Sequence, residues 1–178
     1  IDNVQFSNSA KKDQYKGEAL FLRALGYYYL VTFFNNIPLI LKPYEKSEDF
    51  FPSQAKPEEV WAQIYKDFDD ASKLLPVSYA GKDIGRATKG AALAFLGKCY
   101  LFNHDFTSAD AKFKSVIDLG IYDLMPNYGD NFTEEFENNI ESIFEIQFER
   151  NVGGTALNWV GQPSADGSLT TARAITFA

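Results

Sequence analysis

The segment from residue 85 to residue 120, GRATKGAALAFLGKCYLFNHDFTSADAKFKSVIDLG, constrains the fold most. It carries two stripes of residues at helical spacing: Leu93, Leu96, Gly97 and Tyr100 in the first, and Phe106, Ala109, Phe113 and Val116 in the second. Two antiparallel helices approach closely only where small side chains face larger ones, so we expect Gly97 and Ala109 to lie in the contact between them. The segment is therefore predicted to be a helical hairpin.

The spacing of these residues resembles the tetratricopeptide repeat, which places a large apolar residue, Leu-Gly, Tyr, Ala and Phe at fixed offsets over two helices. Two positions differ, because Leu93 stands where the repeat usually has Trp, and His104 replaces the turn glycine. One such unit cannot bury its own apolar face, so at least one further helical pair must stack on it. The resemblance implies a mostly α fold built of tetratricopeptide-like helical hairpins.

Apolar residues that recur every three or four positions predict a long helix over 9–34, and Pro38 prevents it from resuming. Residues 37–56 have no helical period, and we expect an ordered loop with a short extended piece at 38–41. A further helix is predicted to begin at Pro57 and to end near Leu74. The two helices are expected to form a second hairpin that the loop holds open.

The last part of the chain provides the minor β element of the prediction. Residues 142–149, SIFEIQFE, alternate apolar and polar side chains and are predicted to form a strand, with a partner expected only near Leu39. Residues 150–178 are Gly-rich and irregular. We expect residues 1–178 to form a single domain that is a fragment of a longer chain.

Composition and charge exclude several classes of function. The net charge of −7 and the scattered lysines argue against a nucleic acid or an anionic membrane surface as partner. No apolar run of 18 residues and no basic leader is present, so neither a transmembrane span nor a signal peptide is expected in this chain. The single cysteine, Cys99, excludes an internal disulfide and a cysteine-based zinc site, and we expect it to be a small buried side chain.

The order and spacing of five sequence stretches resemble those of the SusD/RagB family. The resemblance extends over nearly the whole chain to about Phe148. The five stretches are GEALFLRA at 17–24, YYY at 27–29, NIPLI at 36–40, GRATKGAA at 85–92 and IFEIQ at 143–147. One departure is Asn35, which replaces a common glycine at the end of the first helix and is expected in the αL conformation.

The resemblance implies an outer-membrane, surface-exposed lipoprotein of Bacteroidetes that binds glycans or peptides and caps a TonB-dependent transporter. Family members are considerably longer than this chain. The lipid anchor and much of the variable ligand-binding half are thus expected to lie outside it. The resemblance implies no cofactor and does not identify the ligand.

Catalytic and metal sites find little support in the sequence. His104 is the only histidine, and it stands in a hairpin turn instead of beside a nucleophile. Paired carboxylates for glycoside hydrolysis would have to come from Asp67, Asp69 and Asp70, which are interpreted as a solvated helix face, or from Glu134, Glu135 and Glu137, which lie in a turn region. A calcium site near residues 123–131 lacks the EF-hand spacing. No catalytic residue and no metal ligand is predicted.

Aromatic residues outside the helical stripes are the best candidates for ligand contact, since an aromatic face stacks on the apolar face of a sugar ring. Trp159 in the Gly-rich segment is the strongest candidate, followed by Tyr44 and Phe50 in the long loop, with Asn36 as a hydrogen-bonding partner for hydroxyls. The predicted function is non-covalent glycan capture and delivery to the transporter. The alternative is a tetratricopeptide-type scaffold that binds a protein partner.

Overall fold

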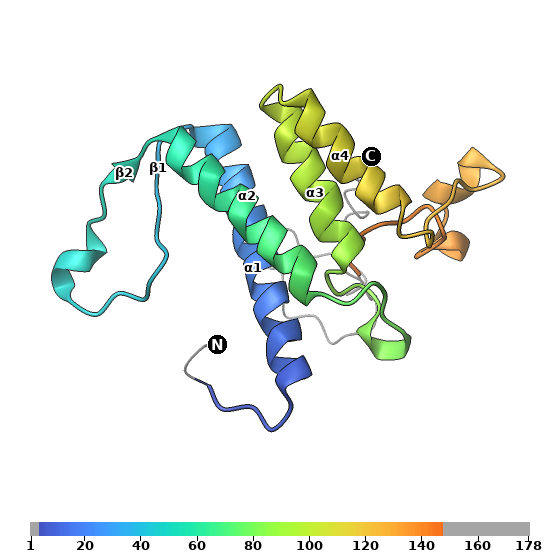
Figure 1. Ribbon diagram of the computed structural model, residues 1–178, viewed down its shortest axis with the longest axis horizontal. Coiled ribbons are helices and arrows are strands. Elements are labelled where there is room, and N and C mark those ends of the chain that lie inside the picture. Colours follow the sequence, from blue (N-terminus) through green and yellow to red (C-terminus); the bar gives the residue numbers. More distant parts are fainter. Residues whose placement is uncertain (1–3, 148–178) are drawn as a thin grey trace, which may run out of the picture.

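Four α-helices that pack in chain order form the described part of the protein. The computed structural model describes residues 4–147. The helices are α1 (Ser9–Phe34), α2 (Pro57–Leu74), α3 (Lys89–Phe102) and α4 (Phe106–Ile117). Helix α1 packs on α2, α2 on α3, and α3 on α4, so two hairpins lie side by side (Figure 1). The predicted mostly helical, tetratricopeptide-like architecture is confirmed.

The remaining regular elements are short. They are the strands β1 (Ile37–Pro38) and β2 (Gln54–Ala55) and the 3-10 helices η1 (Ser47–Phe50), η2 (Gly81–Asp83), η3 (Tyr128–Phe132) and η4 (Glu134–Phe136). The two strands pair antiparallel, with Ile37 opposite Ala55. This two-residue ladder is the β structure of residues 4–147.

The contact between α3 and α4 explains the small residues in the repeat-like segment. A Cβ atom added to Gly97 would lie 2.7 Å from Cε1 of Phe113, closer than real carbon contacts. Ala109 on the facing helix is only 2% exposed. The turn between the helices places His104 at a φ of +62°, which is the conformation that favours glycine at this position of the repeat. The prediction that Gly97 and Ala109 lie in the helix contact is confirmed.

Helix ends follow local hydrogen bonding with one difference from prediction. Thr88 caps α3 as expected, because its hydroxyl accepts a hydrogen bond from Ala91 N at 3.1 Å. Asn35 ends α1 with φ +60° and ψ −85°, so its φ is positive as expected but its ψ lies outside the αL region. The sharp reversal there directs the chain into β1.

The centre of the core is an aromatic cluster around Phe21, which is fully buried. Its ring lies 5.5 Å from Phe68 of α2, 5.6 Å from Phe95 of α3 and 5.1 Å from Phe144, between ring centroids. Three helices and the last described segment therefore share one apolar centre.

The predicted strand at 142–149 is wrong for the residues that the structure describes. Residues 142–147 form no strand, and residues 148 and 149 lie outside the described part. Burial does not follow the two-residue alternation there, because the adjacent residues Ile143 and Phe144 both pack against the core while Ile146 is 52% exposed. The segment is held by these core contacts and has no neighbouring strand within residues 4–147.

Candidate functional site

The long loop between α1 and α2 is fixed at its base. Ile37 is 5% exposed and pairs with Ala55, so the two ends of the loop are held together. The Tyr27 hydroxyl donates a hydrogen bond to Ile40 O at 3.0 Å and accepts one from Ile40 N at 2.6 Å. These contacts tie the first residues of the loop to α1.

Beyond this base the loop projects away from the helices, as Figure 1 shows, and it exposes aromatic side chains. Tyr44 is 42% exposed and Phe50 is 61% exposed, and their ring centroids lie 5.5 Å apart at an interplanar angle of 80°. Phe51 beside them is 88% exposed. An anchored loop thus presents an aromatic surface to solvent, where a ligand with apolar faces can stack.

The predicted contact residues are only partly brought together. Tyr44 and Phe50 form the edge-to-face pair, and exposed Asn36 lies just before β1 at the base of the same loop, where its side-chain oxygen accepts a hydrogen bond from Asn35 Nδ2 at 3.1 Å. Trp159 lies outside the described residues.

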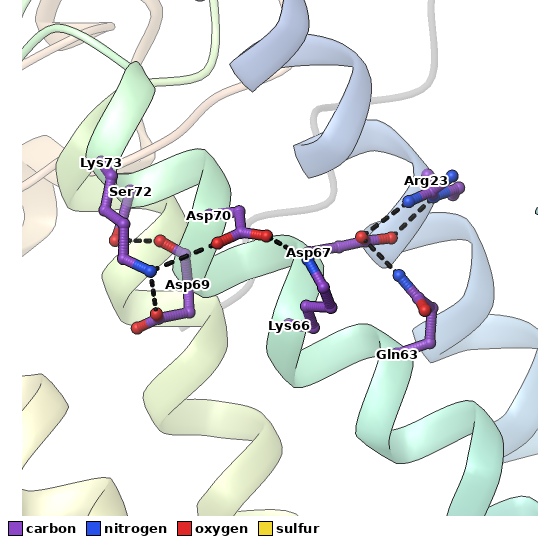
Figure 2. Close-up of polar contacts among 8 residues, drawn as sticks. All are labelled: Arg23, Gln63, Lys66, Asp67, Asp69, Asp70, Ser72 and Lys73. Atoms are coloured by element: carbon purple, nitrogen blue, oxygen red, sulfur yellow. Dashed lines mark hydrogen bonds and ion pairs between the residues drawn. The ribbon is translucent and has the colours of Figure 1, made fainter.

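A second feature is a buried ion pair between α1 and α2. Arg23 donates hydrogen bonds to both carboxylate oxygens of Asp67, each at 2.7 Å, and Gln63 donates a third at 2.7 Å (Figure 2). The Asp67 side chain is 1% exposed, and its hydrogen bond raises the pKa of Arg23. The expected solvated face is therefore wrong for Asp67, because this carboxylate points toward α1 and is fully paired there.

The other acidic residues of α2 do face solvent. Asp70 pairs with Lys66 and Lys73, while Asp69 pairs with Lys73 and with Lys112 of α4. The hydrogen bond from Lys73 lowers the pKa of Asp69, and the one from Lys66 lowers the pKa of Asp70. A general acid for glycoside hydrolysis needs a raised pKa, so the direction of these shifts opposes a catalytic role.

An open groove of about 590 Å³ between α1 and α2 is lined by Arg23 and Asp67 and by Asp70 with its partners Lys66 and Lys73. Because the polar groups that line it include Arg23 and Asp67, which bind each other across the two helices, we interpret this groove as the surface of an interhelix ion-pair network.

An aromatic cluster that the sequence did not predict lies at the end of the molecule where α1 and α3 finish and α2 begins. Trp61 stacks on Phe102 at 5.6 Å, and Tyr65 stacks on Tyr100 at 4.5 Å, between ring centroids. Burial raises the pKa of Tyr65 to about 12. Trp61 and Tyr65 lie in the first half of α2, and Tyr100 and Phe102 lie at the end of α3. Only an antiparallel arrangement of these two predicted helices could have indicated the cluster.

The described residues, 4–147, contain neither a metal-binding cluster nor a membrane-spanning helix. Within this range no group of three or more His, Cys, Asp or Glu side chains is arranged to hold a metal ion. None of the helices in the same range combines the length and the apolar character that a membrane crossing requires.

Comparison with known proteins decides the family. A family model described as "Starch-binding associating with outer membrane", SusD-like, matches residues 1–101. The chain belongs to the SusD-like family. It is 25% identical over 172 residues to SusD-like protein P25 of Formosa agariphila and 27% identical over 156 residues to a SusD-like protein of Bacteroides ovatus.

Solved structures of SusD-like proteins share the fold. A laminarin-binding SusD-like protein has a TM-score of 0.76 at 34% identity over 81% of this chain, and a SusD-like carbohydrate-binding protein of Bacteroides fragilis has a TM-score of 0.75 at 32% identity over 80% of it. The matches cover 32% and 28% of those two structures. The chain likewise spans 32% and 27% of the length of the two curated relatives.

Proposed function

We propose that this chain is the helical part of a cell-surface glycan-binding protein, and that the loop over residues 39–53 contributes an aromatic contact surface for a polysaccharide or oligosaccharide. The observation that carries the proposal is the exposed pair of Tyr44 and Phe50 on a loop anchored to α1. Membership in a family described as starch-binding, and similarity to a laminarin-binding protein, support a glycan over other ligands.

The chemistry of the loop suits a sugar. Pyranose rings have an apolar face of C–H groups, which packs on an aromatic ring, and hydroxyl groups at the rim, which need donors and acceptors. The Tyr44 hydroxyl and the Asn36 amide offer both. Trp159 stays a proposed contact from the sequence.

Binding involves no bond cleavage in this proposal. The low pKa values of Asp69 and Asp70 and the full pairing of Asp67 support a role that is not catalytic. By resemblance to the family, we further propose that the whole protein is a lipoprotein on the surface of the outer membrane and delivers its glycan to a TonB-dependent transporter.

The experiment measures binding of the full-length protein to a panel of glycans that includes laminarin and starch, by isothermal titration calorimetry. Replacing an aromatic ring that stacks on a sugar removes buried contact area, so Tyr44→Ala and Phe50→Ala are each expected to weaken binding roughly tenfold, which corresponds to about 1.4 kcal/mol.

Phe106→Ala is the matched control. Phe106 is 62% exposed, almost the same as Phe50 at 61%, but it lies at the start of α4. We expect it to leave glycan affinity unchanged. Unchanged affinity in both loop variants would remove the loop from the site. Binding of peptides without glycans, or recovery of a protein partner without a TonB-dependent transporter in a pull-down, would contradict the glycan function itself.

A further inference from the structure

The groove between α1 and α2 gathers positive charge in a chain that is acidic as a whole. Its lining includes four cationic side chains and two carboxylates, namely Lys16, Arg23, Lys66, Lys73, Asp67 and Asp70. These side chains carry a formal excess of two positive charges, although the whole chain carries a net charge of −7. A groove lined by an excess of one charge attracts ligands of the opposite sign, because its walls focus the electric field.

The cations stand at a regular spacing on both helices. Lys16 and Arg23 are seven residues apart on α1, and Lys66 and Lys73 are seven residues apart on α2. Seven residues make nearly two helical turns, so the two members of each pair lie on the same face of their helix, about 10.5 Å apart along its axis. The groove is therefore bordered by two cations on each side.

The ion pairs already present leave part of this charge available to a ligand. Asp70 is shared by Lys66 and Lys73, and Asp69 is shared by Lys73 and Lys112 (Figure 2). Three ammonium groups thus share two carboxylates. Lys66 and Lys73 are 67% and 62% exposed, and exposed ion pairs contribute little to stability. A ligand carboxylate can contact these lysines without breaking a costly interaction.

Arg23 is the cation whose position is fixed. Its hydrogen bonds to buried Asp67 come from Nε and one terminal nitrogen, so they hold the guanidinium group in one orientation. The Arg23 side chain is still 33% exposed and lines the groove. A guanidinium group has five N–H donors, which is more than the pair with Asp67 uses. Arg23 can therefore donate to a ligand from the α1 side.

The rest of the lining suits a sugar. Ala19, Leu20 and Leu74 place apolar surface among the cations, where the C–H face of a sugar ring can pack. The groove volume of about 590 Å³ lies within the range of small-molecule sites. The spacing of about 10.5 Å between the cations on each helix is close to the length of an extended disaccharide.

We propose that the groove between α1 and α2 is a second glycan-binding site, selective for an acidic polysaccharide that carries one uronic-acid carboxylate per disaccharide. Lys66 and Lys73 bind successive carboxylates, Arg23 donates from α1, and the apolar side chains pack on the sugar between them. This site is separate from the loop over residues 39–53. It goes beyond the glycan surface proposed above, and each of the two sites can be refuted without the other.

The first test measures binding of the full-length protein to a hyaluronan oligosaccharide, whose repeat has one uronic-acid carboxylate per disaccharide, by isothermal titration calorimetry. The same oligosaccharide with its carboxyl groups reduced to alcohols is the neutral control probe. We expect the acidic probe to bind roughly tenfold more tightly, and to bind more weakly as the salt concentration rises, because mobile ions screen exposed charges. Equal affinity for the two probes, no binding of either, or tighter binding of dextran sulfate or duplex DNA would overturn the proposal.

The second test locates the site with charge variants. Lys66→Gln and Lys73→Gln each remove one cation and are each expected to weaken hyaluronan binding roughly fivefold. Asp70→Asn should act in the opposite direction and tighten binding roughly threefold, because it removes the carboxylate that competes with the ligand for both lysines. A structural role for the ion pairs would not produce this tightening, so weaker or unchanged binding of Asp70→Asn would contradict the proposal.

Lys114→Gln is the matched control variant. Lys114 on α4 is 70% exposed, close to Lys66 at 67%, and it pairs with Asp118 four residues along its helix, as Lys66 does with Asp70. It does not line the groove. We expect Lys114→Gln to leave hyaluronan affinity unchanged. A loss equal to that of Lys66→Gln would show that the net charge of the protein, and not this groove, controls binding.

Discussion

Helices α1 and α2 lie side by side and share one core, but their outer surfaces differ. Helix α1 exposes five large apolar side chains, Tyr15, Leu22, Leu30, Phe33 and Phe34, whereas α2 exposes none. The solvent side of α2 instead carries ion pairs such as those of Asp70 with Lys66 and Lys73 (Figure 2). Burying an exposed Leu or Phe side chain contributes roughly 1.5 to 3 kcal/mol to stability. Covering the exposed side chains of α1 would therefore stabilise the protein, whereas α2 has no such side chains to cover.

The outer side of α2 is suited to contact with water, whereas the outer side of α1 is suited to packing against other groups. Helix α2 is amphipathic and needs only the core on one side and water on the other. Helix α1 satisfies its core contacts and still exposes large apolar side chains such as Leu22 and Phe33.

The largest effect is expected at the inner face of α1. Phe21→Ala removes a fully buried ring that contacts Phe68, Phe95 and Phe144. Loss of the ring and the cavity it leaves should lower the free energy of unfolding by about 3 to 5 kcal/mol, measured by denaturant titration. A loss below about 1 kcal/mol would show that the shared core does not depend on α1.

An intermediate effect is expected for the ion pair that joins the two helices. Asp67→Asn leaves Arg23 without its charged partner, and because the Arg23 side chain is 33% exposed and can be hydrated, we expect a loss of about 2 kcal/mol, below the range for a fully buried pair. Asp70→Asn on the same helix is the control, since the Asp70 side chain is 33% exposed and its pairs lie at the surface. It should change stability by no more than about 0.5 kcal/mol. Equal effects in thermal unfolding would mean that burial does not separate the two carboxylates.

The smallest effect concerns Gly26 on the outer side of α1. A Cβ atom added there would meet no described atom within 4 Å. Gly26→Ala is therefore expected to stabilise the protein by about 1 kcal/mol through helix propensity. A fall in the midpoint of thermal unfolding would contradict this expectation.

Much of the fold was predictable because it depends on local patterns. The period of apolar residues predicted α1 over 9–34 and α2 from Pro57 to about Leu74, in agreement with the structure. The strand was not correctly predicted over residues 142–147, because alternation of apolar and polar residues does not show whether another strand lies beside the segment.

The candidate site was predictable only in part. The sequence indicated aromatic residues outside the helical stripes, and the structure brings Tyr44 and Phe50 together while Trp159 lies outside the described residues. The aromatic cluster of Trp61 and Phe102 was missed, because residues from separate helices meet only through tertiary packing.

The sequence by itself determined the helical hairpins, the close contact at Gly97 and the family, since each rests on short-range spacing that survives without coordinates. Tertiary structure alone decided that Asp67 is buried against Arg23 while Asp69 and Asp70 on the same helix are partly exposed, and that Leu22 and Phe33 of α1 remain exposed. The physical reason is that burial depends on which helix lies opposite a residue, and the residue's own neighbours in the chain do not specify this.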